Sequence, residues 1–204
     1  MEMGIMNWRD LHHMQHLRVH TGEPGVQDGV QNLVLRGLNE EDIRLVPIEG
    51  QNSIAWLLWH MARCEDVAAN DVLSDRGQVL DDSWKTAMGI TRRDIGTGMT
   101  PAEVSELSQR IELDALLSYR STVATRSRDV VDHIEDSYLE SHMTPLEAEA
   151  LRDMGTFAQH AGWVSELWAP KPRLWFLWLL TGHNYMHLQE ALTVRSLGGR
   201  PLGL

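Results

Sequence analysis

Thr181-Gly-His-Asn-Tyr-Met-His-Leu-Gln-Glu-Ala-Leu192 places His183 and His187 four residues apart in a run with helical character. Side chains at this spacing project from one face of an α-helix, a turn apart, so one rigid element would present two imidazoles together. The arrangement is typical of a metal site that takes a further ligand from another helix. His60 is the candidate for that ligand, because it is a lone histidine in a second apolar run, Asn52-Ser-Ile-Ala-Trp-Leu-Leu-Trp-His60.

The hydrophobic pattern is helical over nearly the whole chain, without the alternation that marks β-strands. Helices are predicted over residues 8–20, from 26 to a connector at 47–50, over 52–73, over 100–134 with a break near 111, from 144, and over 173–197. Thr100-Pro-Ala-Glu103 and Thr144-Pro-Leu-Glu147 each combine an N-cap, a proline at the first helical position and a capping-box glutamate. Residues 74–99, rich in glycine and aspartate, form a long connector with a short turn around Trp84.

Four long helical regions and two substantial connectors predict an all-α fold, a four-helix bundle whose long connectors carry short extra helices. Residues 1–204 are interpreted as a single domain, because the sequence has no internal repeat and no second hydrophobic core. Metal and ligand sites of such bundles are built in the core from facing helices. We therefore expect His60, His183 and His187 to meet there.

Composition excludes several classes of partner. The chain has 204 residues, 43% of them hydrophobic, and a net charge of −11. This charge argues against nucleic acid and against an anionic membrane surface, because both require clustered Lys and Arg. The apolar run 174–180 is far shorter than the ~20 residues of a membrane span. One cysteine, Cys64, cannot form an internal disulfide, and the N-terminus lacks a signal-peptide pattern, so we expect a cytoplasmic protein.

The histidine spacing has a rival at the N-terminus. Ten histidines in this chain would produce about half of one such pair by chance, so a pair alone is weak evidence. His12, His16 and His20 form a ladder of two further pairs on the predicted first helix. We favour His183 and His187 because they follow a strongly apolar segment, and a dry wall orients ligands better than a polar surface. The ladder is expected on a half-exposed helix, and ordinary core or surface histidines are the alternative for both groups.

Four polar neighbours of these histidines have a functional and a plainer interpretation. Glu190, on the face of His187, could orient that ligand or act as a catalytic base, or be a solvated carboxylate. Cys64, one turn after His60, could be a fourth ligand or a small apolar filler. Glu65 and Asp66 are adjacent and point in different directions, so at most one of them can face the site, and we expect them to cap helices or pair on the surface.

Residues further from the motif are assigned in the same way. Tyr119 and Arg120 could bind an anionic substrate, although such residues more often extend from a bundle seam. The chain has eight tryptophans. They are expected mainly in the core or a dimer interface, especially Trp56, Trp59, Trp175 and Trp178.

The segments Asn52–His60, Glu65–Asp66, His183–Ala191 and Val194–Gly198 together resemble the DinB-like superfamily of four-helix-bundle metalloenzymes. The resemblance implies a dimer that binds a divalent metal, zinc or nickel, through His60, His183 and His187. Relatives include transferases and isomerases that use a low-molecular-weight thiol, mycothiol or bacillithiol, and others without an assigned reaction. Gln189 departs from a common glycine, and the N-terminal histidine helix and the 74–99 connector have no clear counterpart.

The residues and the resemblance together predict a metal-dependent enzyme that acts on a small molecule. Three neutral imidazoles leave a coordination position of zinc open, where water or a thiol could bind. The alternative is a non-catalytic metal-binding or stress-response bundle protein, which a sealed fourth ligand such as Cys64 would favour. A bundle without metal is the third interpretation. The homodimer is inherited mainly from the resemblance.

Overall fold

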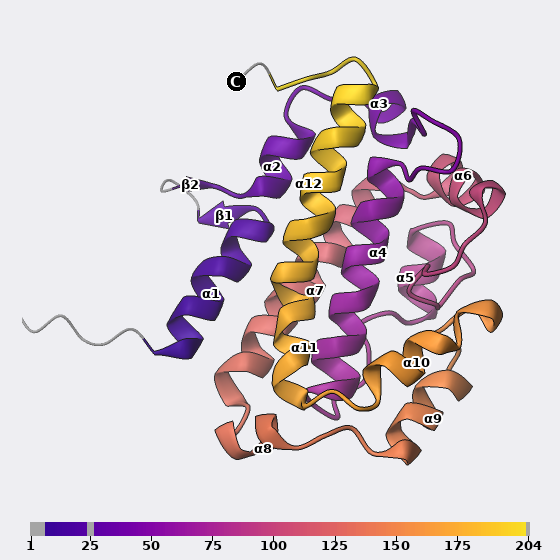
Figure 1. Cartoon of the computed structure of the whole chain (residues 1–204). Coiled ribbons are helices and arrows are strands. Elements are labelled where there is room, and N and C mark those ends of the chain that lie inside the picture. The colour runs from indigo at the N-terminus through magenta and orange to yellow at the C-terminus, as the bar shows by residue number, and fades with distance from the viewer. Residues whose placement is uncertain (1–6, 24–26, 203–204) are drawn as a thin grey trace, which may run out of the picture.

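Four long helical segments run alongside one another in the computed structural model, which describes residues 7–23 and 27–202 (Figure 1). They are α1 (Trp8–Val19), α4 (Ile54–Val67), α7 (Leu113–His133), and α11 (Arg173–Leu180) followed by α12 (Gly182–Leu197). Helix α4 packs against both α7 and α12, and α1 contacts α7 and α12. The predicted all-α helical bundle is confirmed.

Short helices occupy the connectors, as predicted. They are α2 (Val30–Leu35), α3 (Glu40–Arg44), α5 (Asp82–Ala87), α6 (Pro101–Arg110), α8 (Asp136–Glu140), α9 (Pro145–Asp153), the 3-10 helix η2 (Gln159–Ala161) and α10 (Trp163–Trp168). The predicted capping boxes begin α6 at Thr100 and α9 at Thr144. A small antiparallel pair, β1 (Gly22–Glu23) and β2 (Gln27–Asp28), follows α1 and was not predicted.

Two predicted helices are less regular than their sequence pattern indicates. The run 173–197 is divided at Thr181, whose φ of −127° and ψ of −73° are not helical. Asn184 stabilises this break, because its side-chain amide donates to the carbonyls of Leu179 and Leu180 at 3.3 and 3.0 Å. Helix α4 continues into a π-helical turn, η1 (Ala68–Val72). Neither feature has a hydrophobic period that would reveal it in the sequence.

Helix α4 lies at the centre of the bundle (Figure 1). Every residue from Ile54 to Val67 is buried, including His60, Arg63, Glu65 and Asp66. A helix that is apolar on all sides belongs in a core, but buried polar groups are costly unless other groups satisfy them. The partners of these four side chains therefore determine what the interior of the bundle can do. None of the helices in the described part of the chain has the length and apolar character of a membrane span.

Asp66 attaches the long connector to the core. Its carboxylate accepts hydrogen bonds from the backbone amides of Val79 at 2.8 Å and Leu80 at 3.0 Å. It also accepts from the Tyr119 hydroxyl at 2.6 Å and from Arg63 at 2.9 Å. The expectation of a surface position for Asp66 is therefore wrong. The sequence shows the acidic residue but not the connector amides that fold back onto it.

Arg120 is also fully enclosed, and Tyr119 beside it has no exposed surface. The Arg120 guanidinium donates to Gln31 Oε1 at 2.6 Å, to Asn184 Oδ1 at 3.0 Å and to the Val19 carbonyl at 3.2 Å. Both predicted roles, an anion site and a side chain extending from a seam, are wrong for this pair. Arg120 instead ties α7 to α12, to α2 and to the end of α1.

Candidate metal centre

His60, His183 and His187 converge between α4 and α12. Each offers one ring nitrogen, and these atoms all lie within 4.8 Å of one another. Ring centroids are separated by 5.1 Å between His60 and His183, 4.8 Å between His60 and His187, and 4.5 Å between His183 and His187. His60 and His183 are buried, and the His187 side chain is 20% exposed. The four-residue spacing and the packing of α12 on α4 together produce this group.

The ring of His60 is held from two sides. Its Nδ1 donates to the carbonyl oxygen of Ile95, and Trp56, one turn earlier on α4, stacks on the imidazole at 4.8 Å with an interplanar angle of 10°. With Nδ1 occupied, Nε2 is the nitrogen left for a metal ion. The 74–99 connector thus supplies an orienting group for the candidate site.

Gly96 allows that connector to approach α4. Its φ is +84°, and a Cβ at this position would lie 2.5 Å from the ring of Trp59. Only glycine combines this backbone conformation with so close a contact at low cost. Sequence reasoning missed both Ile95 and Gly96, because a backbone carbonyl has no sequence signature and the connector contains several glycines.

Glu190 lies beside His187, as its position on the helix predicts. Its Oε2 is 2.8 Å from His187 Nδ1, and its Oε1 accepts from the Asn52 side-chain amide at 2.9 Å. Asn52 lies just before the N-cap of α4, so this chain of contacts joins the two helices at the site. Both carboxylate oxygens have partners, and the Nε2 of His187 is left for an ion.

The protonation of the buried rings suits a metal ligand. Burial, with a contribution from His187, lowers the pKa of His60 to about 4, and burial lowers the pKa of His183 well below its usual range. Both are therefore neutral near pH 7, which is the form that coordinates metals. His183 Nδ1 is buried and has no hydrogen-bond partner within residues 7–23 and 27–202. An imidazole set with an unsatisfied nitrogen fits a divalent ion such as zinc or nickel.

Cys64 is near this centre but is not in the group of candidate ligand atoms. Its sulfur lies 3.8 Å from both ring nitrogens of His60, which places it against the imidazole ring. Burial raises the pKa of the thiol. The thiolate, which is the form that binds metals, is thereby disfavoured. These contacts match the plainer interpretation of Cys64 as a small core side chain.

A family model for the DinB superfamily matches residues 30–191. The chain belongs to the DinB superfamily. No curated protein sequence is significantly similar to it.

The fold is shared with a solved structure. The chain matches a crystal structure of a conserved protein from Enterococcus faecalis with a TM-score of 0.67 and 18% sequence identity. The match covers 95% of this chain and 98% of the other. At this identity the comparison establishes the shared fold. The DinB family match contains His60 and His183 with His187, whereas α1 lies before its first residue.

A second group of metal-ligand types lies where α1, outside the DinB match, meets α4. His16, His20 and Glu65 are buried, and one potential ligand atom from each lies within 4.8 Å of the others. His16 Nε2 is 2.7 Å from Glu65 Oε1, and His20 Nε2 is 3.0 Å from Glu65 Oε2. Two expectations are therefore wrong: Glu65 is not on the surface, and the histidine ladder does not lie on a half-exposed face. The sequence pattern does not reveal this arrangement, because the apolar residues Leu11 and Met14 face outward while the histidines face the bundle.

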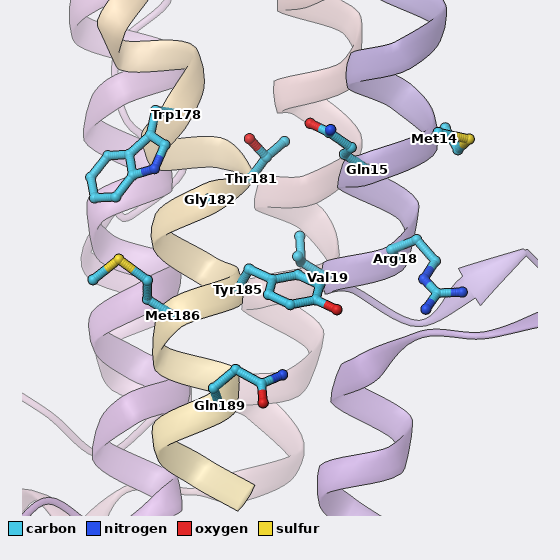
Figure 2. Close-up of a pocket in the computed structure, with 10 residues that line it drawn as sticks. All are labelled: Met14, Gln15, Arg18, Val19, Trp178, Thr181, Gly182, Tyr185, Met186 and Gln189. Carbon is cyan, nitrogen blue, oxygen red and sulfur yellow. The ribbon is translucent and has the colours of Figure 1, made fainter.

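The outer face of α12 borders a mainly apolar groove of about 960 Å³. Figure 2 shows Met14 and Arg18 on α1 across from Tyr185 on α12, with Trp178 at the other side of α12. Trp178 also contacts His183 edge-on, at 5.7 Å between ring centroids. Of the four tryptophans expected in the core or an interface, Trp56 and Trp59 are buried, Trp175 is half-buried against the core, and Trp178 is 38% exposed.

Proposed function

We propose that this DinB superfamily member is a divalent-metal-dependent enzyme in which His60, His183 and His187 hold the ion. The observation that carries the proposal is the convergence of three imidazole nitrogens within 4.8 Å, from two helices that pack together. An ion on three imidazoles, when bound, supplies Lewis acidity and lowers the pKa of a water molecule or thiol at its open position. Zinc and nickel both accept such ligands.

Two neighbouring groups prepare the ligands. The Ile95 carbonyl holds His60 through Nδ1, and Glu190 holds His187 through Nδ1. Hydrogen bonds of this kind fix the tautomer and the direction of a metal-binding ring. Because both oxygens of Glu190 are engaged, by His187 and Asn52, we assign it a positioning role in preference to that of a general base.

Access to the site favours an enzyme over a sealed metal-binding protein. The His187 side chain is 20% exposed and that of Glu190 is 38% exposed, so solvent reaches this edge of the centre. A structural zinc site has four protein ligands, whereas a catalytic site keeps a position free. Cys64 lies outside the group of candidate ligand atoms, which argues against a fourth protein ligand from this side chain. The alternative is a non-catalytic metal-binding or stress-response role. Metal-dependent turnover of a substrate would exclude this alternative, and binding of metal without turnover would support it.

The substrate class rests on the resemblance to thiol-dependent relatives. We propose a small-molecule substrate and a low-molecular-weight thiol as co-substrate, in a transferase or isomerase reaction. The thiol would bind near His187, the most accessible of the three ligands. The homodimer stays a prediction, which light scattering on the purified protein measures.

Metal analysis of tag-free protein tests the centre. We expect about one ion at this centre in the wild type, and its loss after His60→Ala, His183→Ala or His187→Ala. His133→Ala is the matched control, because the side chain of His133 is 69% exposed and lies on α7. Retention of metal at this centre by all three ligand variants would contradict the proposal.

A thermal-shift screen tests the thiol. A ligand that binds the native state raises its apparent stability. We expect a thiol such as mycothiol or bacillithiol to raise the melting temperature of metal-loaded protein. The same thiol should leave the melting temperature of the His187→Ala variant unchanged. An absence of any shift, with metal still bound, would contradict the thiol-dependent reaction while leaving the metal centre intact.

A further inference from the structure

Helix α1 contacts the bundle through an unusual face. Its buried residues are His12, His16 and Val19, while Leu11 and Met14 are 43% and 50% exposed. Amphipathic helices normally bury their apolar side. Imidazoles are poor substitutes for apolar side chains, because a buried polar group is costly unless it is bonded. The attachment of α1 therefore depends on what its histidines bind.

His16 and His20, the second of which is the C-cap residue of α1, meet a carboxylate on α4. The oxygens of Glu65 lie 2.7 Å from His16 Nε2 and 3.0 Å from His20 Nε2, and the two rings are 4.5 Å apart between centroids. Relative exposure is 0% for His16 and Glu65 and 4% for His20. Two histidines four residues apart with a glutamate from another segment form a ligand set that zinc accepts. We propose that His16, His20 and Glu65 form a second divalent-metal site, which fastens α1 to α4.

Helix α4 stands between two histidine pairs of the same spacing. It contributes His60 to the pair on α12 and, further along the same helix, Glu65 to the pair on α1. The two groups differ in chemistry, since one is three neutral imidazoles and the other contains a carboxylate. A carboxylate compensates part of the charge of a divalent ion, which matters more where all ligands are enclosed.

Both oxygens of Glu65 are engaged, by His16, His20 and Asn184, and a bound ion would replace the two histidine contacts. Asn184 donates to Oε2 at 2.8 Å, which orients the group without neutralising it. The guanidinium of Arg120 is bonded to Gln31, to Asn184 and to a backbone carbonyl, with no direct bond to Glu65 in the structure's described residues. The Arg120 guanidinium thus reaches the Glu65 carboxylate only through the Asn184 side-chain amide.

The imidazoles of α1 are also incompletely satisfied by protein groups. His12 stacks on His16 at 5.9 Å, and both His12 Nε2 and His16 Nδ1 are buried without a partner in the part of the chain that is described. A buried ring nitrogen without a partner has lost its hydrogen bond to water without a replacement. The protein groups around α1 therefore leave its imidazoles incompletely bonded, whereas the nitrogens that face Glu65 are the Nε2 atoms of His16 and His20.

The site lies beyond the centre described above, because α1 precedes residues 30–191 of the family match. Its three protein ligands are enclosed, so a water molecule would complete the coordination of the ion, which would bind as α1 docks. The consequence is that metal removal would loosen the attachment of α1, which the contacts of His16 and His20 with Glu65 would then hold alone.

Anomalous diffraction from crystals of the full chain loaded with zinc tests this site directly. We expect a zinc peak between His16, His20 and Glu65 in addition to one at the α12 centre, and two zinc ions per chain by elemental analysis. One zinc per chain with no peak beside Glu65 would overturn the proposal. Because this measurement uses the wild type, it does not depend on any variant folding.

Matched variants separate the two sites. His60→Ala should retain one zinc ion, and addition of Glu65→Gln should remove it, since an amide of nearly the same shape is a weak zinc ligand. Circular dichroism establishes that each variant is folded. Equal zinc content in His60→Ala with and without Glu65→Gln would overturn the second site, whereas retention of two ions by His60→Ala would contradict the α12 centre alone.

Discussion

The histidine pairs on α1 and α12 have the same spacing and face the same helix, but their environments differ. The α12 pair meets His60 at a partly exposed edge, with Glu190 outside the ligand group. The α1 pair meets Glu65 where all three side chains are enclosed. Spacing therefore determines that two imidazoles project together, while the partner residue and solvent access determine the chemistry.

Removal of Glu65 should give the largest effect. Glu65→Ala leaves His16, His20 and Asn184 without their shared acceptor inside the bundle. Loss of one partner from such a buried network costs roughly 3–5 kcal/mol of the free energy of unfolding. Urea denaturation of metal-free protein measures it, with His187→Ala as the comparison from the accessible pair. Similar losses in the free energy of unfolding for the two variants would mean that the enclosed cluster around Glu65 and the accessible cluster around His187 contribute equally to stability.

Gly96→Ala should give the next largest effect. The added Cβ would lie 2.5 Å from Trp59 at a φ of +84°, so strain and overpacking should cost about 1–3 kcal/mol. Displacement of Ile95 should also weaken metal binding at His60. Gly77→Ala is the matched control, with a φ of +71° and nothing within 4 Å of the new Cβ. Equal losses would mean that the contact with Trp59 is unimportant.

Glu190→Gln should weaken metal binding with little change in folding. Loss of the charged acceptor at His187 Nδ1 should reduce affinity about 10–100-fold. Metal titration monitored by competition with a chelator measures this, and Glu166→Gln, at an exposed position on α10, is the control. An unchanged metal affinity would show that His187 needs no orienting carboxylate.

Met14→Gln should have the smallest effect. Met14 is 50% exposed on the outward face of α1, so the change should alter the free energy of unfolding by less than about 0.5 kcal/mol. His16→Gln on the inward face should cost clearly more. Thermal unfolding of the two variants compares the faces of one helix, and a larger loss from Met14→Gln would mean that α1 is held through its apolar side.

Sequence reasoning recovered the features that depend on local chemistry. The caps at Thr100 and Thr144 predicted the starts of α6 and α9, because a side-chain oxygen and a proline act within one turn. His183 and His187 on one face followed from the helical period. The break at Thr181 was missed, since it depends on the Asn184 amide that bonds backbone carbonyls of the preceding turn.

The same limit applies to the buried charges. Glu65 and Asp66 belong to residue types that are mostly found on protein surfaces. Asp66 is buried because backbone amides of the connector reach it, and Glu65 because two histidines and an asparagine do. These partners are distant in the chain, so no local pattern contains them.

The sequence alone specified an all-α chain, the helical face shared by His183 and His187, and His60 as their partner through a family pattern. The tertiary structure decided that the α1 histidines face inward on Glu65, that Ile95 holds His60, and that Glu190 bonds His187. The physical reason is one of range: helical period and capping act over a few residues, whereas the satisfaction of buried polar groups depends on helices and connectors brought together by folding.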